Sequence, residues 1–196
     1  MASLRNLLNR CKPSRISAGI KDPRSRRFVA VIDCILNQNA RDCGAACFPA
    51  MNFELLQMCH AHNVGILQMP CPEIAALGFK RARKPGQSIR EALDTDAGRR
   101  RCAELATEVV DRIDVYLAEG YELLAILGGN PRSPGCAVLN SGEVLLGDSG
   151  VFIKELQAEL RKRKLTVLFM GLRDHDPELL AQDLRCLADR LSERPK

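Results

Sequence analysis

Short apolar runs alternate with longer amphipathic segments from residue 28 onward. Four runs are nearly continuously apolar, which is typical of buried parallel strands; they cover residues 28–36, 64–69, 121–127 and 165–170. Apolar positions spaced three and four apart predict helices at residues 53–62, 99–119, 151–164 and 176–191. Strands joined by helical crossovers form right-handed βαβ units. The pattern therefore predicts a single α/β domain, Rossmann-like, with a mostly parallel sheet and flanking helices.

Two stretches between these elements are less regular. Residues 74–98 carry no period and include a Pro-Gly pair, so we expect a loop or lid there. The basic run in this stretch, residues 80–84, either faces solvent or steers an anionic nucleotide or RNA substrate toward a site. Residues 137–146 predict a weak hairpin with its turn at 140–142.

The positive charge of the chain is concentrated at its start. The formal net charge is +5, but residues 1–27 hold eight basic residues against one acid, a local charge of +7, so residues 28–196 carry −2. A body near neutrality lacks the broad positive field that gives most non-specific affinity for DNA or RNA. A nucleic-acid partner is therefore not favoured, although the tail remains able to contact an anionic surface. We divide the chain into a basic N-terminal extension, residues 1–27, and an α/β domain, residues 28–196.

The extension has features of a targeting segment. It is rich in Arg and Ser, and Leu4, Leu7 and Leu8 follow helical spacing, as in organelle presequences. A frayed basic N-terminus, or a start codon placed too early, is the alternative. No apolar run approaches the ~18–20 residues that span a bilayer, so we expect no membrane partner. The sequence does not indicate an oligomeric state.

Cysteine is the unusual residue in the composition. The chain has 9 Cys and no Trp. An odd number of cysteines without an export signal favours a reducing compartment, in which thiols bind metals or serve catalysis. We expect the cytoplasm, with an organelle as the alternative.

Three cysteines stand at the carboxyl ends of predicted strands. Cys34 lies near the end of the first strand, Cys71 follows the second by two residues, and Cys136 lies in the loop after the third. In an open parallel sheet, ligands bind just beyond these strand ends. Each cysteine taken alone is readily explained as a core residue. Together they predict one metal centre, since thiolates are natural ligands of iron-sulfur clusters and of zinc.

Polar residues next to these cysteines suggest chemistry. Glu73 follows Cys71 by two residues in a stiff Pro-Cys-Pro-Glu run, where a carboxylate beside a metal is suited to general acid or base work. Ser133 places a hydroxyl three residues before Cys136. Asn37 and Asn39, in an Asn-Gln-Asn run after Cys34, are candidate hydrogen-bonding groups for a small heterocycle; ordinary turn chemistry explains them equally well.

In this order and separation, the runs CILNQN (34–39), PCPE (70–73) and SPGC (133–136) resemble the thiouracil desulfidase family. The resemblance covers residues 28–172. It implies a 4Fe-4S cluster held by only three cysteines, Cys34, Cys71 and Cys136, with the fourth iron open to the sulfur of a thiolated nucleobase. It also implies that Glu73 and Ser133 are the catalytic pair. The family loop usually reads Ser-Pro-Ser-Cys, so Gly135 is a departure that bears on substrate preference.

The resulting expectation is an iron-sulfur-dependent desulfidase that releases sulfide from a small thiolated compound such as 2-thiouracil. A soft thiocarbonyl sulfur is a suitable ligand for an open iron. Water would then add at the thiocarbonyl carbon with Glu73 as the base, and Ser133 would stabilise the charge that develops on the substrate. The first alternative is a non-catalytic zinc or iron-sulfur module for sensing or delivery, with Cys43 or Cys47 as fourth ligand. The second is a thiol-redox protein using Cys43 and Cys47, whose spacing of four would place both thiols on one face of a helix.

Overall fold

Four parallel strands form the centre of the protein. A computed structural model describes residues 22–141 and 144–192. Its main sheet has the order β2-β1-β3-β6, and every neighbouring pair in it is parallel. The strands are β1 (Arg27–Ile32), β2 (Gly65–Met69), β3 (Glu122–Gly128) and β6 (Leu168–Gly171). This confirms the predicted Rossmann-like α/β fold.

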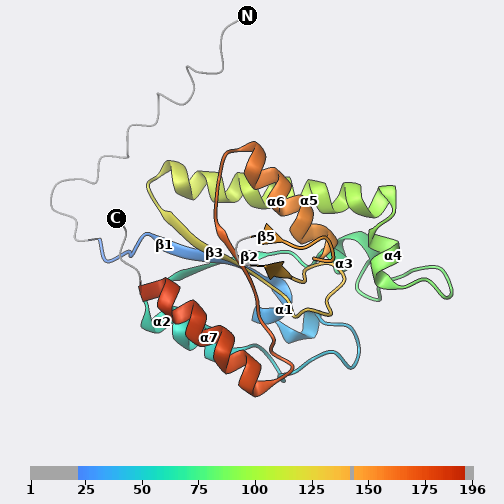
Figure 1. Cartoon of the computed structure of the whole chain (residues 1–196), viewed down its shortest axis with the longest axis horizontal. Coiled ribbons are helices and arrows are strands. Elements are labelled where there is room, and N and C mark those ends of the chain that lie inside the picture. Colours follow the sequence, from blue (N-terminus) through green and yellow to red (C-terminus); the bar gives the residue numbers. More distant parts are fainter. Residues whose placement is uncertain (1–21, 142–143, 193–196) are drawn as a thin grey trace, which may run out of the picture.

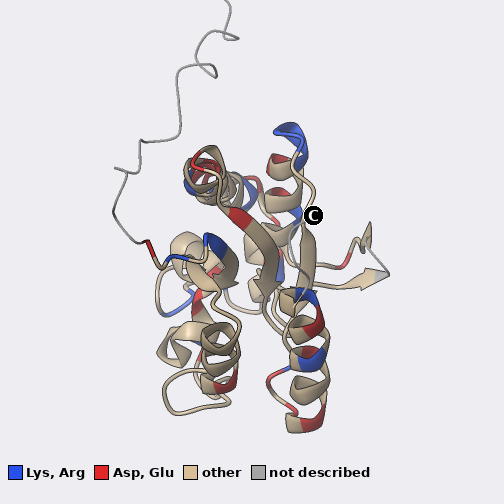
Figure 2. Cartoon of the chain, turned by 90° about the vertical axis from the view of Figure 1, so that its left-hand side faces the viewer, with Lys and Arg blue, Asp and Glu red and all other residues tan. Residues whose placement is uncertain are grey.

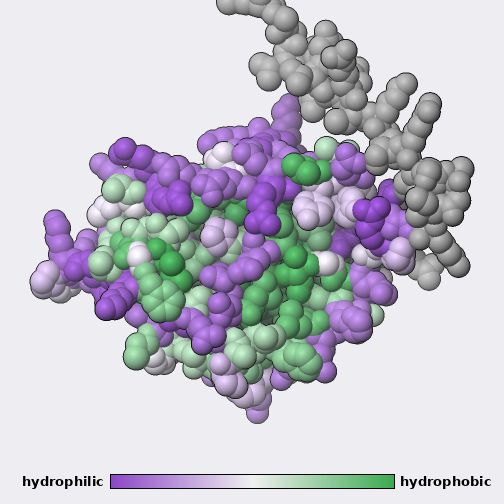
Figure 3. Space-filling view, turned by 180° about the vertical axis from the view of Figure 1, so that it is seen from behind, coloured by the Kyte–Doolittle hydropathy of each residue, from purple (hydrophilic) through white to green (hydrophobic). Residues whose placement is uncertain are grey.

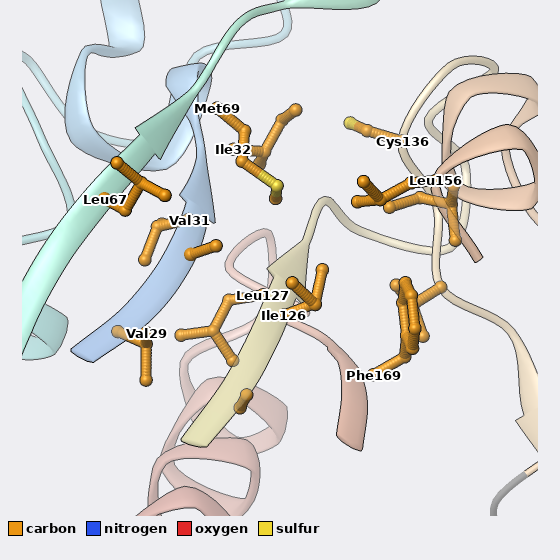
Figure 4. Packing of buried hydrophobic residues seen from close by; sticks show 14 of the residues in the cluster. Val29, Val31, Ile32, Leu67, Met69, Ile126, Leu127, Cys136, Leu156 and Phe169 are labelled. Carbon is orange, nitrogen blue, oxygen red and sulfur yellow. The ribbon is translucent and has the colours of Figure 1, made fainter. Parts of the chain in front are cut away.

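Helices cover both faces of the sheet (Figure 1). One face carries α5 (Asp96–Ala118) and α6 (Val151–Lys162), which pack closely on each other. The other face carries α2 (Phe53–Ala61) and α7 (Pro177–Ser192). The apolar stripes of these helices meet the β-branched and aliphatic residues of the strands, and the core runs continuously through all three layers. Figure 4 shows part of this packing around β1, β2 and β3.

Side-chain caps mark the starts of α2 and α5. The Asn52 side chain accepts a hydrogen bond from the Leu55 amide at 3.0 Å at the start of α2. Thr95 does the same for Gly98 at the start of α5, at 3.2 Å. Each cap satisfies one backbone N–H that the helix itself leaves without a partner. The end of α5 is set by Gly120, whose φ of +78° is accessible to glycine at little cost.

The predicted end of the first strand and the predicted loop at residues 74–98 need correction. The first strand ends at Ile32, and Asp33–Leu36 forms a short helix, α1, because the N–H of Asn37 bonds to the carbonyl of Asp33. Residues 74–98 are not a loop throughout: they contain most of α3 (Pro72–Leu77), all of α4 (Ile89–Leu93) and the start of α5. A capping box between Ser88 and Glu91 starts α4.

The hairpin is shorter than its predicted range. It pairs β4 (Asn140–Ser141) with β5 (Val144–Leu145), so the first two predicted turn residues belong to a strand. The third, Gly142, lies outside the described residues, as does most of the N-terminal extension, up to residue 21.

The charged residues of the domain are mixed in sign. In the view of Figure 2, Lys and Arg are interspersed with Asp and Glu along the helices. The back of the molecule shows apolar residues between hydrophilic rims (Figure 3). Within residues 22–141 and 144–192, no helix combines the length and the apolar character needed to span a bilayer.

The contact between α4 and α5 gives a test of the packing. A methyl group at Gly98 would lie 2.4 Å from the Leu93 carbonyl oxygen. Helix propensity alone predicts that Gly98→Ala stabilises α5 by about 1 kcal/mol. Since backbone atoms cannot move aside cheaply, we expect the variant instead to lower the free energy of unfolding by about 1–3 kcal/mol, as measured by urea denaturation.

Gly147→Ala is the matched control, because a methyl group there would meet nothing within 4 Å. We expect its unfolding midpoint to stay at the wild-type value. A Gly98→Ala protein that is more stable than wild type would show that the two helices do not approach this closely.

Candidate metal centre

The topology brings the loops after β1, β2 and β3 to one edge of the sheet. The chain moves from β1 to β2 on one side and then returns to place β3 on the other side of β1. The gap between β1 and β3 is therefore the topological switch point, where open α/β sheets bind ligands. Cys34 lies in α1 after β1, Cys71 is the N-cap of α3 after β2, and Cys136 lies in the loop after β3.

These three cysteines line one cavity. Its volume is about 450 Å³, and Glu73 and Ser133 also line it. Figure 4 shows the Cys136 sulfur pointing toward Ile32 and Met69, which end β1 and β2. The structure thus brings together five of the seven residues that the sequence singled out. Cys71 and Cys136 are buried, at 8% and 4% exposure, so the thiols face the cavity rather than bulk solvent.

Ser133 is held directly against the Cys136 thiol. The Ser133 Oγ and Cys136 Sγ atoms lie 2.9 Å apart. The backbone N–H of Cys136 also donates to Ser133 Oγ, at 3.3 Å. Because that N–H occupies a lone pair of the hydroxyl, the hydroxyl proton is available for the sulfur or for a group in the cavity.

Glycines allow the Cys136 loop to approach its neighbours. A methyl group at Gly129 would lie 2.7 Å from Cys136 Sγ. One at Gly135 would lie 2.6 Å from Pro72 Cγ, in the loop that carries Cys71. The departure from the Ser-Pro-Ser-Cys pattern therefore has a packing reason: Gly135 permits close contact between two of the cysteine loops, and it does not line the cavity.

The cavity thiols differ in acidity. A hydrogen bond from Cys136 lowers the pKa of Cys34, and the positive charge of Arg41 acts in the same direction against burial. The same hydrogen bond and burial hold the pKa of Cys136 well above its ordinary value. Burial raises the pKa of Cys71 to about 11. Without a metal, Cys34 is thus the thiol that ionises first, and the other two require a positive partner to do so.

Arg81 connects the predicted base to a predicted ligand. Its side chain is 2% exposed, and its Nε lies 3.4 Å from Glu73 Oε2. Its Nη2 lies 3.9 Å from Cys71 Sγ and also donates to the Ala40 carbonyl. The sequence placed Arg81 in a basic run that either faces solvent or steers a substrate. Within that run, Arg81 instead turns inward, whereas Lys80, Arg83 and Lys84 are exposed.

A second buried ion pair lies near Cys34. Arg41 pairs with Asp174, and their side chains are 6% and 0% exposed. Neither residue is distinctive in the sequence, since they stand 133 positions apart and only the fold joins them. Their partner Gln38 is also buried, and it bonds through Nε2 to the Cys34 carbonyl at 2.9 Å and to Asp174 at 3.4 Å.

Asn37 and Asn39 do not line the cavity. Both are exposed, and Asn37 Oδ1 accepts hydrogen bonds from the Asn39 backbone and side chain, at 3.2 and 3.0 Å. This is the turn chemistry that was the alternative explanation for them. In the Asn-Gln-Asn run, Gln38 is the residue that supports the site.

Cys43 and Cys47 do not share a helix face. The segment between Arg41 and Asn52 is irregular, because its backbone forms turns rather than a helix. Both cysteines are exposed, but Cys47 lines the cavity and Cys43 does not. The helical premise for a Cys43–Cys47 redox pair is therefore wrong, and only Cys47 belongs to the cavity.

The donor set of the cavity fits an iron-sulfur cluster. Besides Cys47, it offers the three strand-end thiols from three separate loops, and soft thiolates are the standard ligands of such clusters. Among residues 22–141 and 144–192, no group of three or more His, Cys, Asp or Glu is gathered tightly enough for a single metal ion. A cluster places its irons apart, so its thiolate ligands need not surround one point. The close approach of Gly129 to Cys136 Sγ keeps one of these thiols directed into the cavity.

The chain is similar to an uncharacterized protein of Methanocaldococcus jannaschii. The two are 28% identical over 134 residues, which cover 68% of this chain and 80% of the relative. No protein-family model matches the chain. No solved structure matches it either.

The acidity of the thiols can be measured in metal-free protein. We expect the alkylation rate of Cys34 to reach half its maximum below pH 9.0, the ordinary thiol value, and that of Cys71 only near pH 11. The reason is that alkylation requires the thiolate, whose fraction rises through the pKa. Mass spectrometry after iodoacetamide treatment at a series of pH values gives each midpoint, and scaling to each residue's own maximum removes differences in access.

Replacing Cys136 tests whether its hydrogen bond causes the lowered pKa of Cys34. In Cys136→Ala the midpoint of Cys34 should rise toward 9.0, while Cys43→Ala should leave it unchanged. A Cys34 midpoint that stays low in Cys136→Ala would assign the effect to Arg41 instead.

Proposed function

We propose that the protein is an iron-sulfur-dependent desulfidase that releases sulfide from a small thiolated compound such as 2-thiouracil or a related thio-nucleobase. The observation that carries the proposal is the shared cavity: Cys34, Cys71 and Cys136 line it together with Glu73 and Ser133. The three runs that carry the resemblance to the thiouracil desulfidase family, residues 34–39, 70–73 and 133–136, contain these five residues. The volume of about 450 Å³ lies within the range of small-molecule sites.

The cofactor would be a 4Fe-4S cluster held by the three cysteines. When bound, it supplies an open Lewis-acidic iron for the soft sulfur of a thiocarbonyl. Burial disfavours the free thiolate of Cys71, and the hydrogen bond with Cys34 together with burial disfavours that of Cys136, so both would need the positive charge of a bound cluster to ionise. Cys34, already more acidic, is suited to be the first ligand to engage.

Glu73 and Ser133 would handle protons and charge. The Glu73 carboxylate, fixed by Arg81, is suited to take a proton from the water that adds at the thiocarbonyl carbon. The Ser133 hydroxyl, fixed by the Cys136 N–H, is suited to donate to charge that develops during the addition. Water replaces sulfide at carbon, giving a carbonyl product and hydrogen sulfide. No electrons are exchanged in this reaction.

The charge of the domain favours a small substrate. Residues 28–196 carry a net charge of −2, so the domain lacks the broad positive field that binds a polynucleotide. Free cysteines fit a reducing compartment, so the cytoplasm is the proposed location. An organelle addressed by the basic extension is the alternative.

Anaerobic reconstitution with iron and sulfide tests the proposal. We expect a broad absorption at about 400 nm, typical of thiolate-bound iron-sulfur centres, and sulfide release from 2-thiouracil. Cys34→Ser, Cys71→Ser and Cys136→Ser should each lose most of the bound iron. Glu73→Gln should keep its iron and lose about 10²–10⁴-fold in kcat, and Ser133→Ala about 10²-fold.

Cys43→Ser and Cys186→Ser are matched controls, because both cysteines are exposed and lie outside the cavity lining. They should retain wild-type iron content and turnover. A wild-type protein that binds the cluster but releases no sulfide from any thio-substrate would contradict the enzymatic proposal.

A further inference from the structure

Cys47 is a fourth thiol of the same cavity. It comes from the irregular segment between Arg41 and Asn52, which precedes α2, and it lines the cavity with the three strand-end cysteines. Neither the resemblance to the desulfidase family nor the mechanism above gives this residue a task. Hydrogen bonds with the residues around Cys34 hold Cys47 at the site.

Gln38 ties the backbone of Cys47 to that of Cys34. The Gln38 side chain is 2% exposed. Its Oε1 accepts a hydrogen bond from the Cys47 N–H at 2.8 Å, while its Nε2 donates to the Cys34 carbonyl at 2.9 Å. One buried amide therefore uses both of its ends to join the two cysteines, which fixes where the Cys47 segment meets the cavity.

Arg41 ties the Cys47 side chain to the same place. Its Nη1 donates to Cys47 Sγ at 3.1 Å and to the Ala45 carbonyl at 3.0 Å. Asp174 holds the other guanidinium nitrogen and also binds Gln38. The guanidinium thus fixes where the Cys47 sulfur lies, through a hydrogen bond from a group that is itself held by a buried carboxylate.

The part of the segment that carries Cys47 has little apolar packing. Residues 43–47 are exposed, and Ala45 and Ala46 offer little apolar surface for burial, whereas Phe48 packs against the core. Segments with few buried apolar contacts open locally at small cost. Cys43, four residues earlier, bonds through its backbone to Asp42 and stays outside the cavity lining. Of the two cysteines of this segment, Cys47 is thus the one that Gln38 and Arg41 attach to the cavity.

We propose that Cys47 is a displaceable fourth ligand, which closes the open iron in the resting protein and gives way to the thio-substrate. This inference rests on the proposed function. Four thiolates are the usual complement of a 4Fe-4S cluster, and a closed cluster is shielded from oxygen. On exchange, one thiolate–iron bond is replaced by one bond from the substrate sulfur to iron. No electrons move, and the released Cys47 thiolate takes a proton from water.

Thiol protection in the cluster-loaded protein tests the inference without relying on turnover. Loaded and metal-free protein are treated anaerobically with iodoacetamide, and the alkylation rate of each cysteine is followed by mass spectrometry. We expect loading to slow alkylation at Cys34, Cys71 and Cys136, and to slow it at least tenfold at Cys47. Addition of 2-thiouracil should restore the reactivity of Cys47 alone, while Cys43 should react equally in every state.

Oxygen sensitivity gives a second measurement. Cys47→Ser should lose its absorption at about 400 nm several-fold faster in air than wild type, with the same initial iron content. Cys43→Ser is the control and should decay at the wild-type rate.

The outcomes separate this inference from the proposed function. If the three strand-end cysteines are protected and Cys47 is not, Cys47 is no ligand and the desulfidase proposal stands. If all four stay protected in the presence of thio-substrates, the closed metal-binding module is correct and the displaceable role is wrong. If loading protects none of them, the proposed cluster site itself fails.

Discussion

The pairing of β1 with β2 on one side and with β3 on the other determines where the chemistry of this protein lies. Ile32 stands opposite Met69, and Val31 stands opposite Leu127, so the three strands end at nearly the same level. Because all three are parallel, the loops that follow them meet at one edge of the sheet. A slip of one residue in either pairing would turn side chains to the opposite face and separate the thiols.

Buried charge is the second constraint on the site. Two arginines reach the cavity from different loops, and each pairs with a buried carboxylate: Arg81 with Glu73 and Arg41 with Asp174. Buried ion pairs add little net stability, because desolvation offsets most of their attraction. Their consequence here is positional, since each guanidinium also contacts a cysteine sulfur, Cys71 in one case and Cys47 in the other. Removing either arginine would leave a buried carboxylate without its partner and a cysteine loop without its anchor.

The apolar pattern was sufficient to predict the sheet and the long helices. It also predicted that Cys34, Cys71 and Cys136 converge, because the carboxyl ends of parallel strands lie at one edge of the sheet whatever the order of the strands. Local periodicity could not reveal α3 and α4, since helices of six and five residues are too short to show a period. It also could not reveal the ion pairs. Arg81 looks like part of a solvated basic run, and only its backbone φ of +48° and the fold around it turn the side chain inward. Asn37 and Asn39 looked functional because their residue types serve both turns and binding sites.

The proposed ligand exchange requires rigid thiols and one movable thiol, and the same few residues provide both. Cys71 and Cys136 are buried in loops stiffened by Pro72 and Pro134 and packed through Gly135, so they would be poorly placed to leave a bound cluster. Cys47 instead sits on an exposed segment of small residues, held by side-chain hydrogen bonds rather than by apolar packing. Hydrogen bonds to a side chain can be exchanged for bonds to water at little net cost, whereas buried apolar contacts cannot. A thiol held by Gln38 and Arg41 is therefore the one thiol of this cavity able to leave and return without disturbing the sheet beneath it.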